Sequence, residues 1–177
     1  LSWRGYRKVR KGVKKRIARH MEEFECREIG AYLLFLRGNP AAMKRAKELL
    51  TVSISRFFRD VRLWEIMGVY LIPKLTRRTG SIENGPVRAW SVGCSCGEEV
   101  YSLKILWDLM EKQFSDMPPL EIWATDTNPV VLEKARSGIY PQSSLRNLIP
   151  SILRAYFIPA SGGFAVREAL GRGIHWL

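Results

Sequence analysis

The chain has 177 residues, of which 46% are hydrophobic, and it carries a formal net charge of +12. It contains no run of about 18 apolar residues, and its first residues lack the pattern of a signal peptide, so neither a membrane-spanning helix nor a secretory leader is predicted. The three cysteines, Cys26, Cys94 and Cys96, are odd in number and irregularly spaced, which suits a reducing cytoplasm better than a disulfide framework.

The positive charge is concentrated at the start of the chain. Residues 1–20 hold nine Lys or Arg and no acid. Val9, Val13 and Ile17 recur at four-residue spacing, which predicts a helix with one buried stripe and a cationic face. Such a face attracts phosphate, an anionic membrane or an acidic protein surface, although a simple solvated basic helix has the same pattern.

Residues 1–50 are predicted to form a small helical domain. After the basic helix, a second helix is expected from apolar residues at helical spacing, namely Ile29, Tyr32, Leu33 and Leu36. Gly38 with Asn39-Pro40 would end this helix, and Ala41 to Leu50 would form a third.

Residues 51–85 are predicted to be a connector followed by a helix. The stretch LTVSISRFFRD, residues 50–60, reads as a loop or extended segment that leads into a helix through Trp64, Met67 and Leu71. Arg59 is the charged residue of interest here. Its chemistry alone favours an ordinary structural salt bridge.

From residue 86 to 177 the pattern becomes α/β. Val87–Val92 is predicted to be a strand, and a turn of small residues leads into a helix from Gly97 to about Phe114. Leu120–Thr125 is predicted to be a second buried strand that ends at Asp126. The remaining predicted elements are a helix from Val130 to Arg136 and two strands at Phe164–Arg167 and Ile174–Leu177.

The turn after the first strand and the acid after the second predict a site for a nucleotide-like ligand. In Rossmann-like folds, a carboxylate at this position accepts two hydrogen bonds from a ribose diol. The turn is not G-x-G-x-x-G and Asp126 lies too far along the chain, so a nicotinamide or flavin enzyme is disfavoured. S-adenosylmethionine fits better, because it has the diol but no pyrophosphate, and Glu98 or Glu99 could meet its amino group. No metal site is expected, since His20 and His175 stand at no ligand spacing.

Three motifs in this order resemble the CheR-type chemotaxis receptor methyltransferases. They are LTVSISRFFRD, VRAWSVGCSCGEEVYS and IWATDTNPVVLEKARSGIYP. The resemblance runs from about residue 5 to the end. It implies the first half of a Rossmann-like methyltransferase domain, preceded by a small all-α domain. It also implies a protein-glutamate O-methyltransferase that uses S-adenosylmethionine and forms methyl esters on cytoplasmic chemoreceptor helices.

The resemblance also implies roles for individual residues. Asp126 matches the acid on the ribose hydroxyls, Glu99 the residue near the methionine moiety, and Gly93 a position that leaves room for the cofactor. Arg59 matches an arginine close to the transferred methyl group, with a role in binding or catalysis. Ser55 matches a hydroxyl contact to the cofactor, and Ser53 stands where the family often has Asn. The family turn is commonly Ala-Ser-Thr-Gly, and Cys94 and Cys96 stand at its Ala and Thr positions, so we interpret them as space-saving residues and not as nucleophiles.

The implied reaction is a direct displacement in which an ionised glutamate carboxylate attacks the electrophilic methyl group without a strong base. The implied partner is the acidic methylation region of chemoreceptors, which would contact the basic helix through Lys14, Lys15, Arg16 and Arg19. A nucleic-acid methyltransferase is an alternative that the charge favours, although no N-P-P-Y-like motif is present.

The family fold continues through further strands, including a segment that completes the adenine pocket and a hairpin that some members use to dock on a receptor tail. We expect neither in these residues, and we expect an open edge on the first strand. The chain is therefore predicted to be a fragment, and a non-catalytic binding module is a second alternative.

Overall fold

The computed structural model describes residues 10–50, 55–79, 85–114 and 116–177. The chain divides into two compact units, Leu1–Ile54 and Ser55–Leu177. Within the described residues, no helix is both long enough and apolar enough to cross a membrane. The expected α/β class with a helical N-terminal part is confirmed.

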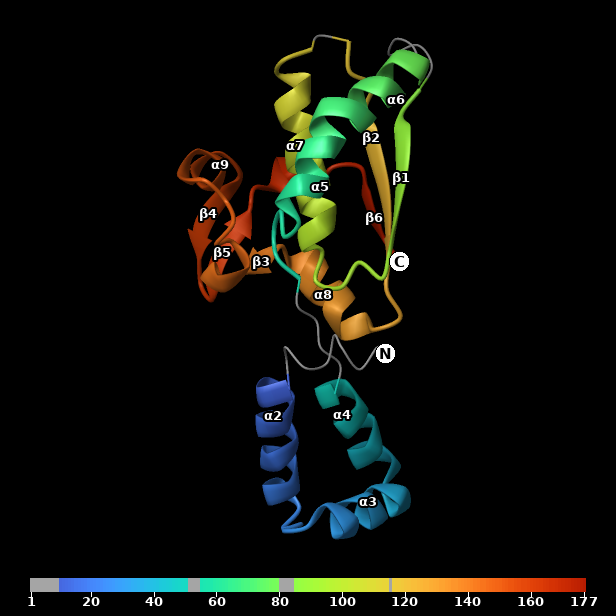
Figure 1. Cartoon of the computed structure of the whole chain (residues 1–177), viewed down its shortest axis with the longest axis vertical. Coiled ribbons are helices and arrows are strands. Elements are labelled where there is room, and N and C mark those ends of the chain that lie inside the picture. The colour runs from blue at the N-terminus through green and yellow to red at the C-terminus, as the bar shows by residue number, and fades with distance from the viewer. Residues whose placement is uncertain (1–9, 51–54, 80–84, 115) are drawn as a thin grey trace. The chain divides into compact units, whose positions relative to one another are not determined.

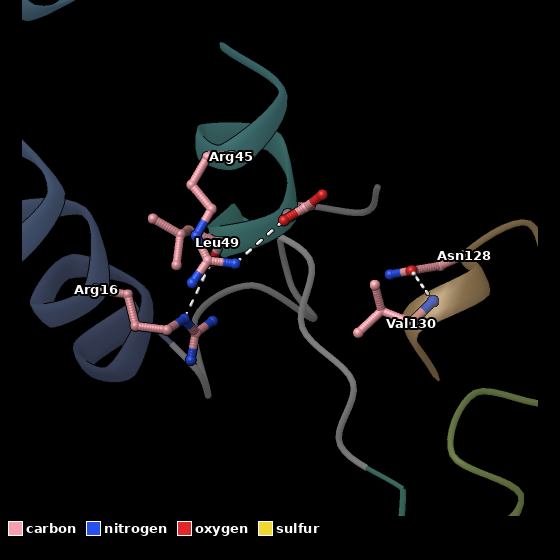
Figure 2. A network of polar contacts seen from close by, with 6 residues as sticks. Arg16, Arg45, Leu49, Asn128 and Val130 are labelled. Carbon is pink, nitrogen blue, oxygen red and sulfur yellow. Dashed lines mark hydrogen bonds and ion pairs between the residues drawn. The ribbon is translucent and has the colours of Figure 1, made fainter. Parts of the chain in front are cut away.

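The first unit contains three helices, α2 (Arg10–Glu23), α3 (Ile29–Gly38) and α4 (Pro40–Leu50). Their core is formed by Tyr32, Leu36, Ala42 and Ala46. Within the predicted stripe of α2, Val13 is buried and Ile17 is partly buried, whereas Val9 lies outside the described residues. The helix α4 packs on α2, and Arg16 Nε donates a hydrogen bond to the Leu49 carbonyl at 3.1 Å, as Figure 2 shows.

The helix predicted through Ile29, Tyr32, Leu33 and Leu36 is confirmed as α3, although Ile29 and Leu33 are 63% and 52% exposed. These two residues are four apart and share a face that turns away from the core of this unit, whereas Tyr32 and Leu36 share the face that is buried. Buried His20 supplies a polar contact that apolar spacing does not reveal. Its Nδ1 lies 2.7 Å from the Tyr32 hydroxyl.

The second unit begins with a continuous helical run of three segments, which are α5 (Val61–Ile66), the π-helical η1 (Met67–Leu71) and α6 (Ile72–Thr79). This run confirms the helix that was predicted through Trp64, Met67 and Leu71. Pro73 has no N–H to donate to the carbonyl four residues earlier, and the widened π turn accommodates that missing bond within the helix.

A parallel sheet of three strands follows, with the order β1-β2-β6. Its strands are β1 (Val87–Val92), β2 (Leu120–Thr125) and β6 (Ile174–Trp176), so three predicted strands are confirmed with boundaries within one residue. In the described residues, β1 is an edge strand of this sheet. Trp90 and Val92 of this strand are each 70% exposed.

A second sheet is antiparallel and has the order β3-β5-β4. Its strands are β3 (Ile139–Tyr140), β4 (Phe157–Ala160) and β5 (Gly163–Val166), and β4 and β5 form a hairpin. The sequence pattern predicts only β5, without its partners, and it predicts no hairpin here. Helix α9 (Pro150–Tyr156) precedes β4, and short 3₁₀ turns cover Gln142–Ser144 and Glu168–Gly171.

Helix α7 (Glu98–Glu111) lies between the two sheets, as Figure 1 shows. Val100, Trp107 and Met110 face a core shared with the parallel sheet, whereas Tyr101 and Ile105 face a core shared with β4 and α9. Packing on two opposite sides fixes the position of this helix between the two cores. The strand before it and the helix after β2, α8 (Pro129–Ser137), complete the βαβα unit that positions the site.

Candidate functional site

The turn between β1 and α7 places three alternate residues in the left-handed backbone region. The φ angles are +70° for Gly93, +53° for Ser95 and +85° for Gly97. At Gly97 a Cβ atom would lie 2.8 Å from the Trp176 side chain and 3.0 Å from the Cβ of Ala135, so both conformation and packing require glycine. At Gly93 a Cβ atom would meet nothing within 4 Å. The turn is therefore tightly packed at the helix and open at the strand.

Asp126, directly after β2, anchors this turn from the neighbouring strand. Its Oδ2 accepts the Ser95 N–H at 2.9 Å and its Oδ1 accepts the Asn128 N–H at 2.9 Å. The Cys94 N–H also donates to the Thr125 carbonyl at 2.9 Å. Asp126 is only partly buried, and each carboxylate oxygen can accept a further hydrogen bond. The carboxylate of Asp126 thus retains acceptor capacity beyond its two backbone hydrogen bonds.

The loop after Asp126 is shaped by a helix cap. Asn128 Oδ1 accepts the Val130 N–H at 3.0 Å, which Figure 2 shows, and Pro129 occupies the first position of α8. An Asn cap followed by proline is a favoured start for a helix. The N–H at the first helical position would have no intrahelical partner, so proline loses no hydrogen bond there. This local chemistry fixes where the chain leaves the site.

Arg59 and Glu99 line one cavity of about 540 Å³, although they come from different elements. Arg59 follows the Phe57-Phe58 pair before α5, and Glu99 lies in the first turn of α7. Both side chains belong to exposed residues, and the edge strand supplies Ser91 and Val92 to the same wall. A cavity of this size is within the range of small-ligand sites. Its wall carries one cation, Arg59, and two anions, Asp60 and Glu99, near the carboxyl end of β1.

The turn that carries Arg59 is held by hydrogen bonds and by aromatic packing. Phe57 is fully buried, and its ring packs edge-on against Tyr140 and Phe157 at centroid distances of 4.9 and 5.0 Å. Its N–H donates to the Ser144 carbonyl at 3.1 Å. The sequence motif alone did not indicate these partners, because they lie far away in the chain.

The cysteines of the turn lack the features of nucleophiles. Burial, with the negative charge of Asp126 nearby, raises the pKa of Cys94 to about 11. Burial also raises the pKa of Cys96. A thiol with a raised pKa holds little of the reactive thiolate. No cluster of three or more His, Cys, Asp or Glu that could hold a metal occurs in the described part of the chain.

The remaining predicted residues are two serines before α5 and four cations on α2. Ser55 is partly buried at the start of the second unit, and Ser53 lies outside the described residues. On α2, Lys14, Lys15, Arg16 and Arg19 are all exposed, which gives the first unit a cationic face. The sequence did not reveal the roles of Ser102 and Asn147, whose side chains hydrogen-bond to the backbone of Phe58. An isolated Ser or Asn carries no signal of such a distant contact.

Comparisons with known proteins agree with this geometry. Residues 53–176 match the family described as CheR methyltransferase, SAM binding domain. A chemotaxis protein methyltransferase of Salmonella typhimurium is 34% identical over 173 residues, which are 93% of this chain and 55% of that protein. One of Borreliella burgdorferi is 34% identical over 123 residues, 68% of this chain and 43% of the relative. A third, from Listeria innocua, is 30% identical over 164 residues, which are 93% of this chain and 60% of that relative. The chain spans about half the length of the curated relatives it matches.

Proposed function

Because the chain belongs to the CheR methyltransferase family, we propose that it transfers a methyl group from S-adenosylmethionine to glutamate side chains of chemotaxis receptors. Relatives named chemotaxis protein methyltransferases support this activity. The observation that carries the proposal is the shared cavity of Arg59 and Glu99 at the end of β1, next to the turn that Asp126 anchors.

The residues present fit S-adenosylmethionine. Asp126 retains acceptor capacity for ribose hydroxyls, and Gly93 borders open space that a larger residue would narrow. Glu99 offers negative charge to the amino group of the methionine moiety, and the hydroxyl of Ser55 is a further candidate contact. When bound, the cofactor supplies a methyl group on a positively charged sulfur, which a carboxylate can displace.

Arg59 is proposed to guide the substrate carboxylate. The glutamate is ionised near neutral pH, so it needs no strong base, and the chain contributes mainly by orienting it and excluding water. A guanidinium attracts a carboxylate and can hold it by two parallel hydrogen bonds. This role is supported by the position of Arg59 on the same cavity wall as Glu99.

The proposed partner is the acidic methylation region of a chemoreceptor, in the cytoplasm. The exposed cations Lys14, Lys15 and Arg19 would face this partner, while Arg16 also holds α2 to α4 through the Leu49 carbonyl. Complementary charge of this kind speeds association and makes it sensitive to salt.

The activity is tested by methyl transfer from tritiated S-adenosylmethionine to a receptor cytoplasmic fragment and, in parallel, to RNA. We expect base-labile label on the receptor fragment, as a carboxyl methyl ester requires, and none on RNA. Label on RNA alone would replace the proposal with the nucleic-acid alternative. Binding of S-adenosylhomocysteine by isothermal titration without any transfer would favour a binding module.

The partner surface is tested by reversing two charges on α2. The Lys14→Glu/Lys15→Glu variant should methylate receptor several-fold more slowly at low salt, with a flatter salt dependence and unchanged affinity for S-adenosylhomocysteine. Arg37→Glu/Lys44→Glu is the matched control, because it reverses two exposed charges on α3 and α4 of the same unit. An equal effect of both variants would show that only net charge matters.

A further inference from the structure

Phe58, directly before Arg59, has an unusual backbone conformation. Its φ angle is +48°, in the left-handed region that a residue with a bulky side chain rarely enters. Such a conformation persists only where surrounding contacts impose it. The direction in which the chain presents Arg59 therefore depends on whatever holds Phe58.

Two side chains from later in the chain hold the peptide groups of Phe58, one at its N–H and one at its carbonyl. The Phe58 N–H donates to Ser102 Oγ at 3.0 Å, and the Phe58 carbonyl accepts from Asn147 Nδ2 at 3.3 Å. The Phe58 ring packs edge-on against Trp64 of α5 at 5.3 Å. These contacts involve both polar groups of the strained residue.

Ser102 connects this clamp to the helix that carries Glu99. It is fully buried, and its hydroxyl donates to the Glu98 carbonyl at 2.6 Å, which leaves the oxygen lone pairs to accept the Phe58 N–H. One hydroxyl thus bonds both the residue before Arg59 and the residue before Glu99. The backbone beside Arg59 and the backbone beside Glu99 are thereby linked through a single buried oxygen atom.

We propose that Ser102, supported by Asn147, is a positioning residue that holds Phe58 in its left-handed conformation and so directs Arg59 toward the cavity that it shares with Glu99. This inference rests on the proposed methyl transfer for its catalytic consequence. Its structural part, the clamp on Phe58, is independent of any activity. A misplacement of about 1 Å in an orienting group can slow a reaction by about a hundredfold.

The test compares Ser102→Ala with Tyr101→Phe. Tyr101 is the adjacent buried residue of α7, and its hydroxyl donates to the Ala135 carbonyl at 3.3 Å, away from Phe58. Both variants remove one buried hydroxyl from the same helix. For Ser102→Ala we expect kcat to fall about ten- to a hundredfold. The KM for S-adenosylmethionine should stay within about threefold of wild type, because the variant removes no contact to the cofactor. Tyr101→Phe should change neither constant.

Two readouts do not depend on turnover. Amide hydrogen exchange at Phe58 should accelerate by up to about tenfold in Ser102→Ala, the factor that corresponds to the net strength of one hydrogen bond. The ¹H–¹⁵N NOE of the Arg59 Nε–Hε group should fall in the same variant, because the side chain is then less restrained. Neither signal should move in Tyr101→Phe.

Asn147→Asp provides a second variant in case Ser102→Ala does not fold. Aspartate has the shape of asparagine but no N–H to donate to the Phe58 carbonyl, and Asn147 is only partly buried. It should lower kcat and the Arg59 NOE without a large change in KM.

The outcomes separate the two proposals. Wild-type kcat in Ser102→Ala or, if that variant does not fold, in Asn147→Asp would overturn the positioning role, as would equal losses in Ser102→Ala and Tyr101→Phe. If wild-type protein transfers no methyl group to receptors, the proposed function fails. The clamp is then supported or refuted by Phe58 exchange and the Arg59 NOE alone.

Discussion

The turn after β1 and the turn before α5 both place backbone in the left-handed region, and they do so by different means. In the turn after β1, glycines occupy two of the three left-handed positions, Gly93 and Gly97. In the turn before α5, the left-handed residue is Phe58, and hydrogen bonds from Ser102 and Asn147 hold it. The first turn is built largely by its own composition, and the second by its surroundings.

The two turns therefore differ in how much of the surrounding fold they need to keep their backbone conformation. A glycine turn retains its conformation wherever its flanking strand and helix form, whereas a turn held by distant side chains needs the whole unit to be folded. The residue with the proposed chemical role, Arg59, lies in the second kind of turn. The orientation of Arg59 should therefore be lost more easily than the backbone conformation of the turn after β1.

The largest effect is expected from Arg59→Ala, which removes the group that the second turn presents. Turnover should fall at least about a hundredfold, the usual loss when a charged stabilising group is removed, while the thermal midpoint changes little because Arg59 is exposed. A tritiated-methyl assay with receptor substrate measures this loss. Arg62→Ala, an exposed arginine of α5 outside the cavity wall, is the control and should retain its activity.

Gly97→Ala should destabilise the first turn more than any other single methyl group placed there. The left-handed φ and the close approach to Trp176 together should cost about 2 to 5 kcal/mol of unfolding free energy. Gly93→Ala is the matched control, since its Cβ meets open space and only the conformational cost of about 1 to 2 kcal/mol remains. Urea denaturation measures the loss of unfolding free energy in both variants. Equal losses would contradict this comparison.

Asp126→Asn should weaken cofactor binding by about tenfold or more, because one charge-assisted acceptor and one backbone tie of the turn are lost. Isothermal titration with S-adenosylhomocysteine gives the change in Kd. Glu121→Gln is the control, as Glu121 lies on the same strand but pairs only with exposed Arg88 at 3.5 Å among the described ion pairs. Equal weakening by both variants would indicate a general charge effect.

The smallest effect is expected at Ser95, the non-glycine position of the first turn. Ser95→Gly should be about 0.5 to 1 kcal/mol more stable than Ser95→Ala, because glycine relieves the positive φ at some cost in unfolded-state entropy. Both variants keep the N–H that donates to Asp126. Chemical denaturation resolves the difference, and a more stable alanine variant would show that the backbone there is unstrained.

Prediction from the sequence succeeded where the signal is local. The strands β1 and β2 were predicted from β-prone and apolar residues bounded by turn residues, and α8 begins with an asparagine cap and a proline, so their boundaries follow from neighbouring residues. The small strands β3 and β4 escaped prediction because each is defined by pairing with β5 and not by a period of its own. Helix α7 is buried on two sides, which its own sequence does not reveal, because the second sheet that covers one side is only partly predicted.

The same distinction holds at the site. A turn of small residues and an acid after the second strand predict a site for a nucleotide-like ligand from their own chemistry and position. The role of Arg59 follows only from the family resemblance, because its chemistry alone favours an ordinary salt bridge, and these site roles stay predictions. The partners of Phe58 emerged only from the fold. Ser102 and Asn147 are ordinary residues in sequence, and they acquire a role because packing brings their hydrogen-bonding groups to a strained peptide far away in the chain.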